Sequence, residues 1–232
     1  KRRVDKMKTK YYGNSEYKSN KEITQKIRAE SIEKTKDENL NEWYATYYDA
    51  EFFINCTDPE YLLSFYKKRK HYEVRFNSWF KDVDLDNNVH LDIGFSTGKS
   101  LFWLGQKYNN IIIDAFDFNE NCKNLFSVLK ELIPQIRNIS IDDASKINLI
   151  NDHYDSITAL DFYEHVPKNI MLDSLKINFN ALKQKGRMYL YLGKTIQEEH
   201  INILEDKQTI DICTSLGFKF IENIDELLIF EK

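Results

Sequence analysis

The stretch "VHLDIGFSTGKSL" (residues 89–101) joins a short apolar run, a glycine-rich turn and the start of a helical segment. The run "VHLDI" has the length of a buried strand, and "KSLFWLGQKY" (99–108) is typical of a helix. Gly94 and Gly98 permit a tight turn and a close backbone approach to a ligand. The stretch therefore predicts a strand, a ligand-binding loop and a helix, in that order.

The same alternation continues through the rest of the chain. Further strand-like runs are separated by helical segments and lie at about residues 111–118, 138–143, 154–162 and 187–193. This spacing predicts right-handed crossovers and a parallel sheet with helices on both faces. The last two runs, 218–222 and 226–231, are too close together for a crossover, so they predict an antiparallel hairpin.

The loop itself allows two interpretations. Its tail, "GFSTGKS", resembles a phosphate-binding loop, which requires four residues between its glycines and then Lys and Ser or Thr. Here only three residues separate Gly94 from Gly98. A shorter loop cannot place its amides around a phosphate in the same way, so Lys99 and Ser100 are interpreted as first-turn residues of the following helix.

The other interpretation uses the residues before the turn as well. "LDIGFSTG" resembles motif I of the class I S-adenosylmethionine-dependent methyltransferases, with Asp92, Gly94 and Gly98 at matching positions and Ser96 in place of the middle glycine. The ribose of such a cofactor needs a carboxylate at the end of the second strand, about 20 residues further on. Asp117, followed by Phe118, meets that requirement, whereas its alternative role is that of a helix N-terminal carboxylate.

Two later segments extend the resemblance over residues 89–232. In "NISIDDAS", Asp143 and Ala144 match the acidic and small residues that contact the adenine in this family, although Asp143 could instead cap a short helix. "LDFYEHVP" resembles the fourth motif, with Phe162 beside the cofactor and Asp161 near the methyl group. The resemblance implies an α/β fold: a Rossmann-like, seven-stranded, mostly parallel sheet with an antiparallel C-terminal hairpin strand.

The candidates for proton transfer are histidines near the same motif. An imidazole ordinarily titrates near neutrality, so His165 is our first candidate for the general base, oriented by Asp161 or Glu164. His200 follows the fifth predicted strand and is the second candidate. The alternative roles are helix anchoring for Glu164 and His165 and a surface position for His200. These residues could also hold Mg²⁺, but no regular ligand spacing supports a metal, and we expect none.

The N-terminal part of the chain predicts two further regions. Residues 1–40 contain 12 Lys and Arg against 7 Asp and Glu and form a basic, helical arm, whereas residues 41–232 contain 21 against 30. Residues 41–82 form a helical lid or extension before the methyltransferase domain at 83–232. A new helix is expected after Asp58 as its cap and Pro59 as its first residue. The lid contributes three aromatic candidates for the acceptor pocket: Trp43, Tyr47 and Tyr48.

The composition limits the compartment and the partners. Three separated cysteines without a C-x-x-C pair fit a reducing cytoplasm and argue against a thiolate zinc site. No apolar run has the length of about 18 residues that a transmembrane helix needs. The basic arm could contact a membrane surface or another anionic partner, or it could simply be solvated. The sequence does not indicate an oligomeric state.

The function predicted from these patterns is O-methylation of a small molecule or a glycan, with S-adenosylmethionine as the cofactor. A protein or nucleic-acid methyltransferase that grips its substrate with the basic arm is the alternative. Against DNA amino-methylation, "LDFYEHVP" lacks the Asp/Asn-Pro-Pro-Tyr signature. A catalytically inactive fold that serves as a binding module is the third hypothesis, although the presence of Asp92, Gly94, Gly98 and Asp117 together argues against it.

Overall fold

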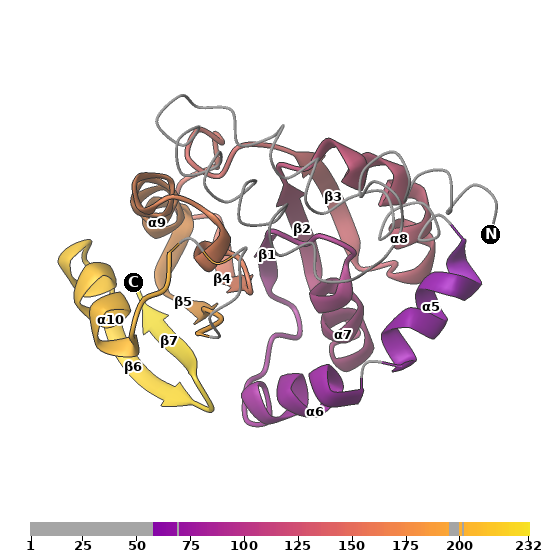
Figure 1. Cartoon of the computed structure of the whole chain (residues 1–232), viewed down its shortest axis with the longest axis horizontal. Coiled ribbons are helices and arrows are strands. Elements are labelled where there is room, and N and C mark those ends of the chain that lie inside the picture. Colours follow the sequence, from indigo (N-terminus) through magenta and orange to yellow (C-terminus); the bar gives the residue numbers. More distant parts are fainter. Residues whose placement is uncertain (1–57, 69, 195–199, 201) are drawn as a thin grey trace, which may run out of the picture.

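The computed structural model describes residues 58–232 except 69, 195–199 and 201 (Figure 1). Its seven strands form one sheet in the order β3-β2-β1-β4-β5-β7-β6. The strands are β1 (Val89–Ile93), β2 (Ile112–Asp117), β3 (Ile136–Ile141), β4 (Tyr154–Leu160), β5 (Leu182–Tyr191), β6 (Lys219–Ile224) and β7 (Leu227–Glu231). The helices are α5 (Pro59–Lys68), α6 (Lys70–Trp79), α7 (Lys99–Lys107), η1 (Glu120–Leu125), α8 (Phe126–Leu132), η2 (Tyr163–His165), α9 (Lys168–Ala181) and α10 (Asp206–Ser215).

Both faces of the sheet are covered by helices, because successive side chains of a strand point to opposite faces. In β5, Tyr189 and Tyr191 pack in a core with residues of α5 to α8, whereas Met188 and Leu190 pack with α9 and α10. Strand β7 divides its residues between the same two cores. In Figure 1, α5 to α8 and α9 to α10 lie on opposite sides of the molecule. The predicted three-layer arrangement is therefore confirmed.

The strand order reverses between β1 and β4. The chain first builds β1, β2 and β3 outward in one direction, and β4 then pairs with the free side of β1 in parallel. In open α/β sheets, ligands bind at this reversal, beyond the carboxyl ends of the strands. Only β7 runs antiparallel to its neighbours β5 and β6, which confirms the predicted C-terminal hairpin.

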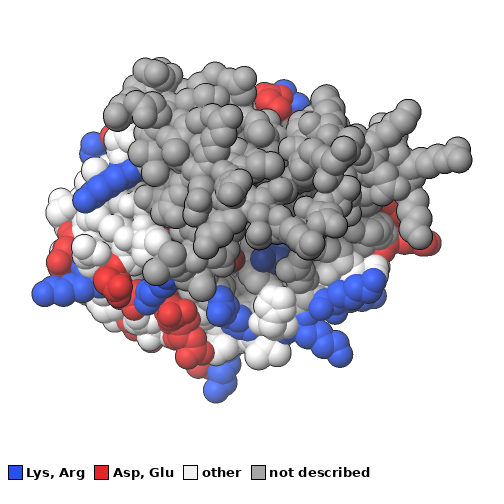
Figure 2. All heavy atoms as spheres, viewed as in Figure 1, with Lys and Arg blue, Asp and Glu red and all other residues white. Residues whose placement is uncertain are grey.

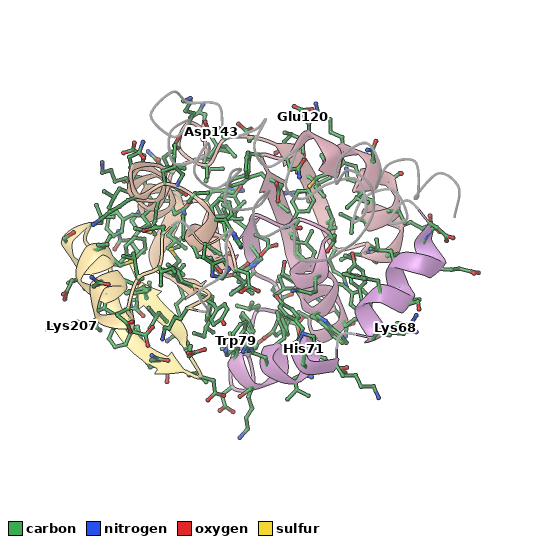
Figure 3. The ribbon with its side chains drawn as sticks, viewed as in Figure 1. Lys68, His71, Trp79, Glu120, Asp143 and Lys207 are labelled. Carbon is green, nitrogen blue, oxygen red and sulfur yellow. The ribbon has the colours of Figure 1, made fainter. Side chains whose placement is uncertain are left out.

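The helix predicted after Asp58 begins there. The Asp58 side chain accepts a hydrogen bond of 2.9 Å from the backbone N–H of Glu60, and its carbonyl accepts one from Leu62. The structure describes two helices in the following stretch, α5 and α6, on either side of residue 69, which lies outside the described residues. Helix α6 contacts the β6–β7 turn through Trp79, whose Nε1–H donates a hydrogen bond to the carbonyl of Asp225. Figure 3 shows Trp79 on the inner side of α6.

The remaining predictions for the N-terminal part are not covered by this description. Trp43, Tyr47, Tyr48 and the basic arm at 1–40 lie outside the described residues. Basic and acidic side chains lie next to one another along the described edge of the face in Figure 2. Among the described helices, none combines the length and the apolar character that a membrane span requires.

Candidate functional site at the switch point

The loop after β1 is shaped by three left-handed residues. Gly94, Ser96 and Gly98 have φ angles of 73°, 49° and 79°, a region that favours glycine. A Cβ added at Gly94 would lie 2.3 Å from the ring of Phe162, and one at Gly98 would lie 2.4 Å from Leu129. Both glycines are therefore required by conformation and by space. Ser96 adopts a left-handed backbone conformation, which is strained for a residue with a side chain, at the position where the resembled motif has its middle glycine.

Asp117 ends β2 and joins this loop to the next strand. Its Oδ2 accepts a hydrogen bond of 2.8 Å from the backbone N–H of Ser96, and its Oδ1 accepts one of 2.9 Å from Asn119. Burial raises the pKa of the Asp117 carboxyl, and the backbone donors act against that rise. The backbone of Phe118 and the thiol of Cys122 act in the same direction, so several donors hold the carboxylate against the glycine loop. The next side chain, Phe118, is half-buried.

Asp92 lies behind the loop, where it is 1% exposed. Its two carboxylate oxygens accept hydrogen bonds from Ser100, at 2.7 Å, and from Thr158 of β4. Burial raises the pKa of Asp92 to about 6, although these two donors oppose the rise. The carboxylate thus fixes the start of α7 against β4. Its predicted role in cofactor binding stays a prediction, and the structure supports an action through the loop that it holds.

No sequence motif indicated that a histidine joins the hydrogen-bond network of Asp92. His90 is fully buried in β1, with Nδ1 at 2.7 Å from Ser156 Oγ and Nε2 at 2.9 Å from Thr158 Oγ1. Because Thr158 donates its hydroxyl proton to Asp92, it can only accept from His90. The ring is therefore protonated at Nε2 and accepts from Ser156 at Nδ1. Burial lowers the pKa of His90 to about 3.

Asp143 and Ala144 follow β3 at the same edge of the sheet. Asp143 Oδ1 accepts hydrogen bonds from both the backbone N–H and the hydroxyl of Ser145, at 2.9 and 2.7 Å. The pKa of Asp143 is lowered: burial opposes this change, and the contacts with Ser145 and Lys146 outweigh it. Asp143 thus makes contacts within a local turn, and the described chain has no helix between it and β4 for it to cap; Ala144 is buried beside it. In Figure 3, Asp143 lies along the same edge as Glu120, which follows β2.

The turn after β4 carries four of the predicted site residues: Asp161, Phe162, Glu164 and His165. Asp161 has a left-handed φ of 54°, and its backbone N–H donates to Tyr191 of β5. Phe162 then turns its ring onto Gly94, so that the turn after β4 touches the glycine loop. The backbone N–H of His165 donates to the carbonyl of Phe162 at 3.0 Å, which closes η2.

Glu164 and His200 converge on Gly193, which follows β5. Glu164 is fully buried; its Oε1 accepts from the N–H of Gly193 at 2.7 Å, and its Oε2 has no hydrogen-bond partner among the described residues. Burial raises the pKa of Glu164 to about 8, and the nearby charge of Asp161 adds to the rise. The rings of His165 and His200 pack edge to face with centroids 4.8 Å apart. His200 is therefore buried, and its alternative surface position is wrong.

Helices α5 and α6 also contact the loop, which sequence reasoning missed. Tyr66 of α5 donates its hydroxyl proton to the carbonyl of Thr97, inside the glycine loop. Tyr72 of α6 lies under Lys99, whose Nζ is 3.7 Å from the ring centroid. Both tyrosines are buried, and the sequence analysis assigned neither of them to the site. Lys99 is thereby directed at an aromatic ring.

Solved structures with this architecture are numerous, although no protein-family model and no curated protein sequence matches the chain. An S-adenosylmethionine-dependent methyltransferase from Aquifex aeolicus aligns with a TM-score of 0.58 at 14% identity, over 75% of this chain and 96% of that one. The [4+2]-cyclase SpnF gives 0.55 at 16% identity, over 64% and 57%. Phosphoethanolamine N-methyltransferase 2 of Haemonchus contortus, in complex with S-adenosylmethionine, gives 0.53 at 14%, over 66% and 38%.

These likenesses establish the class of the fold. The chain has the Rossmann-like fold of the class I S-adenosylmethionine-dependent methyltransferases, as its sequence motifs predicted. It spans little more than half of the cyclase and well under half of the N-methyltransferase. Since one of these neighbours is a cyclase, the shared fold leaves the reaction and the substrate to be argued from the site.

Proposed function

We propose that this protein is an S-adenosylmethionine-dependent methyltransferase. The observation that carries the proposal is the position of Asp117 beside a loop that tolerates only glycine at positions 94 and 98. Both features lie at the reversal of strand order, where ligands of α/β sheets bind. A glycine loop next to a strand-end carboxylate is the arrangement that a nucleoside with free ribose hydroxyls requires.

The residues present fit such a cofactor. Asp117 places a buried carboxylate at the end of β2, where ribose hydroxyls would join or replace the donors that it accepts from now. The half-buried ring of Phe118 and the small side chain of Ala144 suit contact with the adenine. Asp92, Gly94, Ser96, Gly98 and Phe162 shape the wall on which the methionine part would lie. Asp143 would contact the adenine only with the acceptor capacity that Ser145 leaves.

The chemistry follows from what the chain offers next to this wall. When bound, S-adenosylmethionine supplies a methyl group on a positively charged sulfur, open to in-line attack by a nucleophile. The protein must hold the acceptor in line, exclude water and take up the proton of a hydroxyl acceptor. His165 and His200 are the candidate bases, since both are buried within reach of Glu164. Asp161 and Glu164 would orient them.

We further propose a hydroxyl of a small molecule or a glycan as the acceptor. The support is the pair of imidazoles at the turn after β4, since a hydroxyl must lose a proton whereas a sulfide acceptor need not. A protein or nucleic-acid acceptor remains the alternative, and it depends on the basic arm at 1–40. Deletion of that arm decides between them: methylation of free sugars and phenols should persist, whereas a grip on a macromolecule would be lost.

The cofactor is tested by ligand-induced stabilisation. We expect S-adenosylhomocysteine to raise the melting temperature and ATP with Mg²⁺ to leave it unchanged, because binding to the folded state stabilises by mass action. Asp117→Asn keeps the side-chain volume and removes the charge, so it should weaken cofactor binding by about 1–3 kcal/mol. Stabilisation by ATP with Mg²⁺ and none by S-adenosylhomocysteine would overturn the proposal.

A further inference from the structure

Three side chains with metal-ligand atoms meet beside the proposed cofactor site. The carboxylate of Glu164 and the imidazoles of His165 and His200 each place one ligand atom within 4.8 Å of the others. Their exposed fractions are only 0%, 7% and 5%. They come from η2 and from the segment after β5, two parts of the chain separated by more than 30 residues. The fold therefore places three potential metal ligands close together in a buried site.

Glu164 gives the second, independent observation. One of its carboxylate oxygens is buried without a hydrogen-bond partner among the described residues, and no salt bridge there involves this residue. A buried, unpaired carboxylate oxygen carries a large desolvation cost, and native proteins rarely leave one without compensation. Asp161 adds negative charge nearby instead of relieving the cost. The local electrostatics thus favour a positive ion at this oxygen.

Gly193 explains how the two parts of the chain come this close. A Cβ at this position would lie 2.7 Å from Glu164 Oε1 and 2.8 Å from Cε1 of the His200 ring. Only glycine leaves room for a carboxylate and an imidazole to converge on the same stretch of backbone. Its N–H also holds Glu164 Oε1, which leaves the other oxygen of the carboxylate for a further partner.

We propose that Glu164, His165 and His200 bind one divalent cation of the first transition series, such as Zn²⁺, Mn²⁺ or Fe²⁺. Two imidazoles with one carboxylate suit these ions, whereas Mg²⁺ and Ca²⁺ prefer all-oxygen ligand sets. Ligand atoms at about 2.1 Å from such an ion lie roughly 3.0–3.5 Å from one another. Atoms that are now as much as 4.8 Å apart reach that spacing by side-chain rotation.

The cation would have a defined use, and this part of the inference rests on the proposed function. Three protein ligands leave coordination positions open, as in catalytic metal sites. An acceptor with neighbouring hydroxyls can occupy them, and the bound hydroxyl then loses its proton more readily. His165 would act as a ligand instead of the base. The acceptor favoured by such a site is a diol or a catechol-like compound.

The experiment measures cation binding by the full chain without any cofactor. Protein freed of metal with a chelator is titrated with Zn²⁺ in a calorimeter and with Co²⁺ in a spectrophotometer. We expect one ion per chain and a Co²⁺ absorption stronger than that of the hydrated ion. Glu164→Gln and His200→Gln should each weaken binding at least about tenfold. The matched control is His71→Gln, since His71 is an exposed histidine of α6 and is not one of the three proposed ligands.

Two results would overturn the cation site: no uptake of Zn²⁺ or Co²⁺ by the wild type, or equal weakening by His71→Gln and His200→Gln. Circular dichroism checks that each variant is folded, and the Co²⁺ spectrum of the wild type carries the test if a variant is not. S-adenosylhomocysteine binding is measured on the same samples. Cofactor binding without cation uptake removes this inference alone, whereas cation uptake without cofactor binding removes the proposed function alone.

Discussion

Replacement of His90 should change how the fold responds to acid. The folded pKa of His90 is lowered from 6.5 to about 3, so its stabilising effect is present above pH 6.5 and is lost as the pH falls toward 3. At about pH 4.5 the imidazole of His90 is protonated in the unfolded state but stays neutral in the folded state, because its folded pKa lies lower. Two pH units at about 1.36 kcal/mol each cost the fold about 3 kcal/mol.

Asp92, on the same network, should act in the opposite direction. Its folded pKa is raised from 3.8 to about 6, so its stabilising effect is complete below pH 3.8 and is lost as the pH rises through 6. Acidification from pH 7 to about pH 4.5 therefore raises the free energy of unfolding by about 2 kcal/mol, because the roughly 1.5 pH units below the folded pKa each contribute about 1.36 kcal/mol. The two groups, joined through Thr158, nearly cancel in the wild type.

The assay is urea unfolding at pH 7 and at about pH 4.5, followed by tryptophan fluorescence. Compared with the wild type, His90→Gln should lose about 3 kcal/mol less of its free energy of unfolding on acidification, because it lacks the unfavourable protonation. Asp92→Asn, the matched control, should lose about 2 kcal/mol more. The reasoning is refuted if His90→Gln and the wild type respond equally, since His90 would then bind its proton equally in both states.

Three further substitutions test the loop. Gly98→Ala combines a left-handed φ with a Cβ 2.4 Å from Leu129, so it should lower the free energy of unfolding by about 2–4 kcal/mol in urea; a loss below about 1 kcal/mol would contradict the geometry. Tyr66→Phe leaves the buried loop carbonyl without its donor and should cost about 1–3 kcal/mol by the same measurement, with weaker S-adenosylhomocysteine binding in calorimetry. Lys99→Ala should keep S-adenosylhomocysteine affinity within about threefold, because its ammonium lies over the ring of Tyr72, and should lose the cation–π contact of about 1 kcal/mol; loss of binding would restore the phosphate-loop interpretation.

The fold was predictable because each of its steps is local in the sequence. Short apolar runs, helical segments and glycine turns each depend on neighbouring residues, and the parallel order follows from connection length. Asp58 could be identified as a cap for the same reason.

The sequence predicted which residues belong to the candidate site better than it predicted how they contact one another. Glu164 and His165 were found through a short motif, but their convergence with His200 depends on Gly193, whose importance is visible only in three dimensions. His90 was missed because a single polar residue inside a strand-like run has no periodic signature. Its partners, on β4, are 66 and 68 positions away.

The contact between Phe162 and Gly94 would couple the two halves of the site thermodynamically if ligand binding displaces the glycine loop. The ring of Phe162 fills the space above the glycine loop, and the carbonyl of the same residue holds His165. A ligand that displaces the loop must move this ring, and the turn that carries Glu164 moves with it. Linkage is reciprocal, so whatever binds at Glu164 changes affinity at the loop by the same factor that loop binding changes affinity at Glu164.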